Sequence, residues 1–118
     1  MQPSPNPRSK QPLTHVVYHI LLALTDGPLH GYGIIKEVEG RTGGETVLEA
    51  GTLYAALKRL KEKDLVEVTG TGVHQGRQRR DYGLTASGHD ALAGESHRLA
   101  ELVSMAKAKR VLPADSAS

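Results

Sequence analysis

The segment from Glu49 to Val68, EAGTLYAALKRLKEKDLVEV, joins an amphipathic helix pattern to a strand-like end. Leu53, Leu57 and Leu60 recur at helical spacing, which predicts a helix over residues 51–63 with these leucines buried. The predicted helix also carries four basic residues against one glutamate, and every basic residue lies off the leucine stripe. A charged face is usually only solvated, so the elements around this helix decide whether its charge has a partner.

Two helices are predicted before this segment. LTHVVYHILLAL, residues 13–24, carries apolar side chains on two faces of a helix, and the sequence TDGPLHG breaks that helix. A shorter helix is predicted from Tyr32 to Thr42, with Ile35 and Val38 directed inward. Tyr32 adjoins apolar helix positions, and its ring is expected in the core.

A hairpin and a fourth helix are predicted after the segment. LVEVTG and RRDYGLT have the composition of two short strands, and TGVHQG between them supplies the glycines of the hairpin tip. Tyr82 is expected in the core, and Thr85 is predicted to cap a helix over residues 86–110. Three helices, a hairpin and a helix follow the order of a winged helix-turn-helix domain. The predicted fold class is therefore mainly α, with a small two-stranded wing and a long C-terminal dimerisation helix.

The composition of the 118-residue chain limits its chemistry. It has no Phe, Trp or Cys, which leaves an aliphatic core and excludes disulfides, cysteine-bound metals and thiol catalysis. It also lacks an apolar run of membrane-spanning length and a signal-peptide pattern, so a cytoplasmic protein is expected. No nucleophile elbow, phosphate loop or paired carboxylate indicates an enzyme, and no cofactor is expected. The net charge is only +2, so any binding of nucleic acid must follow from where the charges lie.

One folded domain with a helical extension is expected. Residues 13–85 form the winged helix and residues 86–112 the dimerisation helix, whereas the proline-rich residues 1–12 and the polar residues 113–118 should be disordered. The apolar stripe of the last helix has too little of its own domain to pack on, and a second copy of the chain would cover it. The predicted interface residues are Tyr18, Leu22, Leu92, Leu99, Leu102, Val103 and Ala106.

The third helix of a winged helix enters the major groove of DNA, and the wing follows the backbone. Short side chains at Thr52, Ala55 and Ala56 would let the helix approach base edges. Arg59 would then read a base, while the other basic residues contact phosphates. The predicted DNA-binding residues are Thr52, Tyr54, Ala55, Lys58, Arg59, Lys61, Arg77, Arg79 and Arg80. The alternative is a winged-helix interaction module whose basic face binds an acidic protein partner.

Three blocks of the sequence, HGYGIIKEV, GTLYAALKRLKEKDLVEV and RRDYGLTASGHDAL, resemble the signature blocks of the PadR family of bacterial transcriptional regulators. The resemblance runs from about Leu13 to Leu112, and the single C-terminal helix resembles the short-tailed branch of the family. Two positions depart from the family pattern, because Ala55 replaces a common proline and Asp64 replaces a helix-ending glycine. The resemblance implies a homodimeric repressor that swaps its fourth helix across the interface and binds an inverted repeat in double-stranded DNA.

The resemblance also implies a small-molecule effector that releases the DNA. Pockets of the family lie between the first and fourth helices at the dimer centre, which nominates His15, Tyr18, His19, Leu22, Leu99, Val103 and Ala106. Independently of the resemblance, His15 and His19 have a spacing that can hold zinc. No third ligand lies close in the sequence, so surface or interface histidines are the favoured interpretation and no metal is expected.

Overall fold

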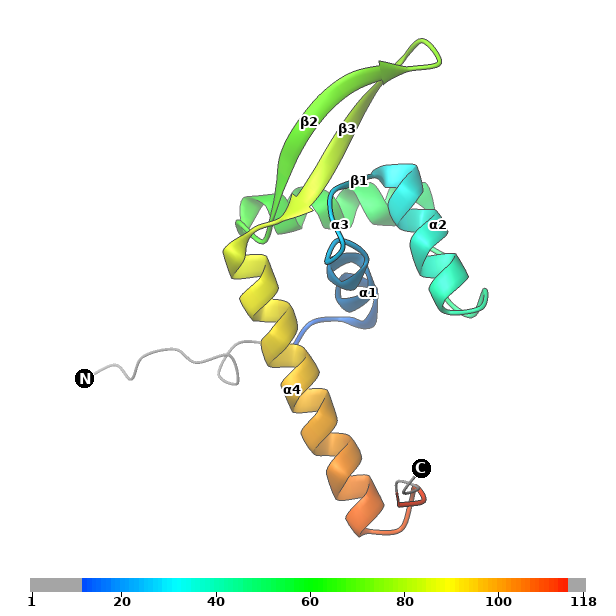
Figure 1. Cartoon of the computed structure of the whole chain (residues 1–118), viewed down its shortest axis with the longest axis vertical. Coiled ribbons are helices and arrows are strands. Elements are labelled where there is room, and N and C mark those ends of the chain that lie inside the picture. Colours follow the sequence, from blue (N-terminus) through cyan, green and yellow to red (C-terminus); the bar gives the residue numbers. More distant parts are fainter. Residues whose placement is uncertain (1–11, 115–118) are drawn as a thin grey trace, which may run out of the picture.

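The computed structural model describes residues 12–114, so the predictions of disorder for residues 1–12 and 113–118 fall almost wholly outside the described residues. Three helices, a β-hairpin and a long final helix follow in the predicted order (Figure 1). A further short strand precedes the second helix. The elements are α1 (His15–Ala23), β1 (Leu29–His30), α2 (Gly31–Arg41), α3 (Ala50–Glu62), β2 (Val66–His74), β3 (Arg77–Leu84) and α4 (Ala86–Ala108).

The core is aliphatic and is built mainly by α1, α2 and α3. The leucine stripe of α3 is buried as predicted, and the basic residues of the helix lie outside it. Two details of the prediction are wrong. In α2 the fully buried isoleucine is Ile34, whereas Ile35 is half-buried at the edge of the core. Ala56 of α3 faces inward and is only 2% exposed, so it does not belong to the outer face of the helix.

The sheet has three antiparallel strands in the order β1-β3-β2, so the wing has one more strand than predicted. β1 pairs with β3 through Leu29 opposite Tyr82, and Tyr82 is buried as predicted. β2 and β3 pair along their whole length, with a bulge between Val68 and Gly70. The strands are longer than the sequence indicated, and only the two residues at 75 and 76, both with positive φ, make the turn.

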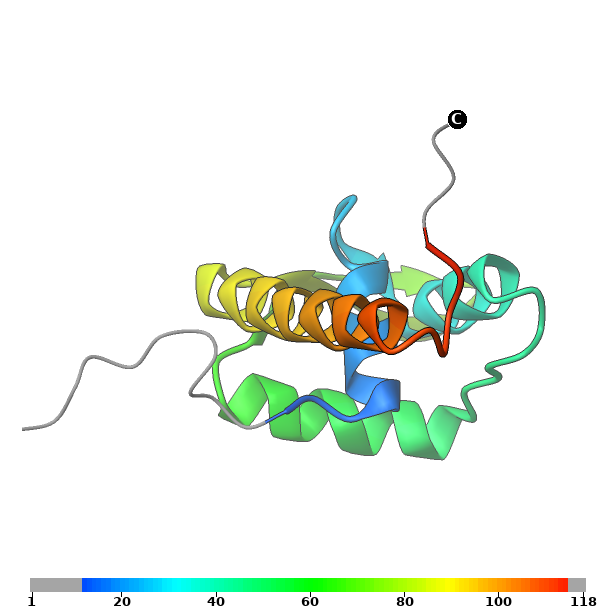
Figure 2. The ribbon, with the colours of Figure 1, turned by 90° about the horizontal axis from the view of Figure 1, so that it is seen from below.

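The cap of α4 is formed as predicted, because the Thr85 hydroxyl oxygen accepts a hydrogen bond from the Gly88 N–H at 2.9 Å. Before it, Asp64 adopts a left-handed φ of 62° after α3, a conformation that glycine usually supplies at a helix end and that aspartate tolerates. α4 packs on α1 through its first half and then extends away from the other helices (Figure 1), and seen from below it crosses α1 (Figure 2). Within residues 12–114, each helix is too short or too polar to cross a lipid bilayer.

Candidate nucleic-acid interface

The outer face of α3 carries six of the nine side chains predicted to contact DNA. All six are exposed, and they are Thr52, Tyr54, Ala55, Lys58, Arg59 and Lys61. The burial of Leu53, Leu57 and Leu60 produces this outcome, because the helix can turn only its other faces outward. Small and basic side chains therefore share one exposed surface, as the spacing of the leucines predicts.

A surface depression of about 430 Å³ lies between α3 and the wing. Lys58 and Lys61 line it from α3, and Arg80 lines it from β3, so three cationic side chains converge there. Glu62 supplies a single negative charge at the same place, and the Tyr54 ring forms part of the wall. Arginine and lysine donors around a concave surface bind phosphate through charge-assisted hydrogen bonds, so the depression suits an anionic backbone.

The three wing arginines do not share one face. Side chains alternate along a strand, so Arg80 lies on the side of α3, while Arg77 and Arg79 lie on the other side of the wing. The Arg79 Nε atom is 3.5 Å from Asp81 Oδ1, an oxygen that is buried and makes no hydrogen bond. Asp81 thus offsets part of the charge of Arg79. Had the predicted strand begun at residue 77, the alternation of side chains along RQRRDY would have placed Arg77 and Arg79 on the face opposite Arg80.

The start of α2 extends this surface, which the sequence interpretation missed. Gly31 lies against the Tyr54 hydroxyl, and an added Cβ at Gly31 would clash with the phenol. Tyr32 is 60% exposed, so its predicted place in the core is wrong. The Lys36 Nζ atom lies 5.6 Å from the centre of the Tyr32 ring, in cation–π range. Gly31 thus brings the start of α2 against Tyr54 of α3, and Tyr32 and Lys36 are exposed on the same helix.

The residues predicted to line an effector pocket point in two directions within one chain. The Tyr18 hydroxyl is 2.8 Å from Ser96 Oγ of α4, which is the predicted side. His15 and His19 instead face the end of α2, through Thr46 and Arg41 respectively. No cluster of three or more His, Asp or Glu side chains suited to a metal ion occurs among the described residues. Any shared pocket would need surface from a second chain.

The outer half of α4 carries the exposed apolar side chains expected of an interface. Leu99, Leu102 and Val103 are 39–50% exposed, and each is a large aliphatic residue. Leu92 is different, since it is 5% exposed and belongs to the core of its own chain. Its own domain therefore already covers Leu92, and this corrects its predicted role at a dimer interface.

Three helices, a β-wing paired with a short strand, and an exposed basic third helix define a winged-helix protein. Residues 20–94, well over half of the chain, match the transcriptional regulator PadR-like family. The chain belongs to this family, which confirms the resemblance seen in its sequence blocks. The family consists of transcription regulators rather than enzymes.

Several relatives are similar over much of this chain. An uncharacterized 37.1 kDa protein in transposon TN4556 of Streptomyces fradiae is 43% identical over 83 residues, which cover 70% of this chain and 22% of that protein. Bacillus subtilis PadR, solved in complex with operator DNA, is 26% identical with a TM-score of 0.61, over 68% of this chain and 46% of that one. This chain thus spans less than half the length of either protein.

A PadR family transcription regulator from Clostridium difficile R20291 matches over its full length. It is 26% identical, has a TM-score of 0.67, and the match covers 84% of this chain and 100% of that one. This chain therefore spans the whole length of that relative.

Proposed function

We propose that this chain binds double-stranded DNA in a sequence-specific manner through α3 and the wing, and that it acts as a homodimeric repressor on an inverted-repeat operator. The observation that carries the proposal is the convergence of Lys58, Lys61 and Arg80 on the depression beside an exposed face of small side chains. The complex of Bacillus subtilis PadR with operator DNA supports the assignment.

The proposed roles follow from the reach of each side chain. Thr52 and Ala55 are short, so the axis of α3 can approach the floor of the major groove. Arg59 lies one turn beyond Ala55 and can extend to a base edge, where arginine prefers the paired acceptors of guanine. Lys58, Lys61 and the wing arginines Arg77, Arg79 and Arg80 contact phosphates, together with the Tyr54 hydroxyl.

Assembly and control belong to the same proposal. Residues 13–85 form the DNA-binding unit, and residues 86–112 join two copies through the exposed side of α4 together with Tyr18 and Leu22. A small-molecule effector would bind between α1 and α4 at the centre of such a dimer and release the DNA. A protein with this function works in the cytoplasm, where the DNA of a bacterium lies.

An acidic protein partner remains the second candidate, because two aromatic side chains are exposed at this surface. Tyr32 and Tyr54 are both at least half exposed, and tyrosine is enriched where proteins meet. Their phenols can equally donate hydrogen bonds to phosphate oxygens. DNA selected in vitro from random sequence distinguishes the two candidates: a partner module would enrich no common sequence, and a repressor would enrich a palindrome.

Arg59→Ala tests the reading role. Loss of a bidentate arginine–guanine contact should remove about 1–3 kcal/mol of the preference for selected over random DNA. Arg80→Ala is the matched control, because a phosphate contact should weaken binding to both DNAs alike and reduce the salt slope by about one.

Affinities of both variants for both DNAs should be measured across a salt series. Equal losses on selected and random DNA for Arg59→Ala would show that Arg59 contacts a phosphate. Failure of the wild-type protein to bind any duplex at low salt would overturn the DNA-binding function itself.

A further inference from the structure

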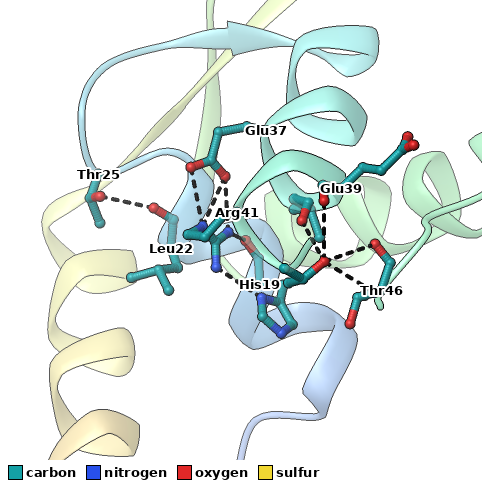
Figure 3. Close-up of polar contacts among 9 residues, drawn as sticks. His19, Leu22, Thr25, Glu37, Glu39, Arg41 and Thr46 are labelled. Carbon is teal, nitrogen blue, oxygen red and sulfur yellow. Dashed lines mark hydrogen bonds and ion pairs between the residues drawn. The ribbon is translucent and has the colours of Figure 1, made fainter. Parts of the chain in front are cut away.

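Arg41, at the end of α2, makes a set of contacts that joins α2 to α1 (Figure 3). Its guanidinium donates to both carboxylate oxygens of Glu37 at 2.9–3.1 Å, one turn earlier in the same helix. The same group reaches α1, where Nη1 lies 3.0 Å from His19 Nδ1 and Nη2 donates to the His19 carbonyl oxygen at 3.2 Å. One side chain therefore holds a carboxylate on α2 and two acceptors on α1.

This geometry fixes the protonation state of His19. Arginine has only donors and stays charged, so the Nδ1 atom of His19 must offer its lone pair to Nη1. The compatible form is the neutral imidazole with its proton on Nε2. Protonation at Nδ1 would place an N–H against the N–H of Arg41 and add a second positive charge at 3.0 Å. The imidazolium and Arg41 would then compete for the Glu37 carboxylate.

The contact lies where it can set the position of the helix-turn-helix. Arg41 is the last residue of α2, and the loop after it leads to α3. His15 adds a second tie, since its Nε2 atom is 3.3 Å from the Thr46 hydroxyl in that loop. Thr42 shapes the same loop, because its hydroxyl oxygen accepts from the Thr46 N–H at 3.1 Å. His19, through Arg41, and His15, through Thr46, therefore both contact the stretch of chain that leads from α2 into α3.

We propose that His19, Arg41 and Glu37 form a proton-sensitive clamp that positions α2 against α1 and loosens when His19 is protonated. The inference rests on the proposed function only where it concerns DNA, because loosening the clamp would disturb the placement of α3 in the groove. His19 and Arg41 are positioning residues, since neither lies on the exposed face of α3. The clamp gives the regulator a pH dependence that needs no ligand.

On balance, the surroundings of His19 also favour its neutral form. Burial, followed by the positive charges of His15 and Arg41, lowers the pKa of His19 from its ordinary value of 6.5, and Glu37 opposes them. The Tyr18 ring also stands near, with its centre 6.2 Å from that of His19. Because the folded chain then binds fewer protons than the unfolded chain, the free energy of unfolding rises with pH in this window. Stability is lost as the pH falls from about 6.5 through the lowered pKa.

Denaturant unfolding from about pH 7.5 to about pH 5 tests the clamp without DNA. The variant is His19→Gln, which keeps a side-chain acceptor for Arg41 and cannot titrate. The control is His89→Gln, which removes an exposed histidine of α4. We expect the unfolding midpoint of the wild type and of His89→Gln to fall with pH, and that of His19→Gln to fall less. Equal slopes for all three proteins would overturn the proposal.

An NMR titration of the wild-type imidazoles covers the case in which His19→Gln does not fold. At neutral pH, His19 should carry its proton on Nε2, and it should titrate below its ordinary pKa of 6.5. A proton on Nδ1 would overturn the proposal directly, because Arg41 could not then donate to that atom.

DNA binding gives the second test. The ratio of wild-type to His19→Gln affinity should fall by about fivefold between neutral and acidic pH, at the lower end of couplings between sites. Taking this ratio cancels every effect of pH on DNA affinity that the two proteins share. A constant ratio would show that the clamp affects stability alone and would overturn its role in positioning α3. Absence of DNA binding by both proteins at every pH would instead count against the proposed function, and the unfolding and NMR results would still decide the clamp.

Discussion

Replacing Leu99 and Leu102 together by lysine is expected to turn a dimer into folded monomers. Both side chains are 39–50% exposed in one chain and contribute little to its own core. In a two-fold interface each substitution occurs twice, once in each subunit. Four lost leucines at about 1.5 kcal/mol each weaken association by about 6 kcal/mol, or more than about ten-thousandfold. Operator affinity should fall as well, because two half-sites would no longer be bound together.

Light scattering at micromolar concentration checks the mass, and circular dichroism checks that the variant stays folded. Val73→Lys is the control, since Val73 is an aliphatic residue on the wing that is 73% exposed, even more than the two leucines. The control should remain dimeric. A wild-type protein that is already monomeric at this concentration would contradict the proposed assembly.

Gly88→Ala is expected to cause the largest loss of stability. Gly88 lies in the first turn of α4, directly against the chain that leaves α3, and an added Cβ would overlap the Leu65 carbonyl oxygen. That oxygen also accepts the Thr85 N–H at 3.2 Å, so it cannot move without breaking the hydrogen bond before the helix. We expect a loss of about 3 kcal/mol, at the upper end of overpacking effects. The gain in helix propensity, about 1 kcal/mol, is smaller.

Gly40→Ala makes the same chemical change at a helical position with open space around it. No atom lies within 4 Å of a Cβ built there, so only the propensity gain remains. This variant should be more stable than the wild type by about 0.5–1 kcal/mol. Urea unfolding of both variants measures the expected loss of stability for Gly88→Ala and the expected gain for Gly40→Ala. A Gly88→Ala protein as stable as Gly40→Ala would show that the α3–α4 corner can relax.

The sequence predicted the elements whose signals are local. The leucine stripe of α3 and the cap at Thr85 depend on residues within one or two turns, and both are confirmed. β1 could not be predicted, because its two residues become a strand only by pairing with Tyr82 and Asp81, about fifty positions away. Ile34 and Ile35 are adjacent and chemically equal, so the choice of the buried residue depended on where α2 begins.

The sequence predicted which residues of α3 form the candidate site, but it predicted only part of their arrangement relative to the wing. The outer face of α3 follows directly from the buried stripe. The relation of the wing to α3 does not, because the face on which each arginine lies depends on the pairing register of β3. Tyr32 illustrates the same limit, since an aromatic side chain beside apolar residues is usually buried. Here the Tyr32 side chain points outward although its neighbour Gly31 is buried, and the Lys36 ammonium lies over the ring.

The short strand β1 has a mechanical consequence for the wing. It pairs with β3 only at Asp81 and Tyr82, and the bulge in β2 lies opposite the same place. The base of the wing is therefore restrained by two hydrogen-bonded neighbours and moves with the start of α2. Between the turn and residue 80, β3 pairs only with β2. Glycines at positions 70 and 72 of β2 make this part of the hairpin easier to bend. We therefore expect a force applied at the Gln75–Gly76 turn to bend the outer ribbon at the bulge before it displaces α2 or α3.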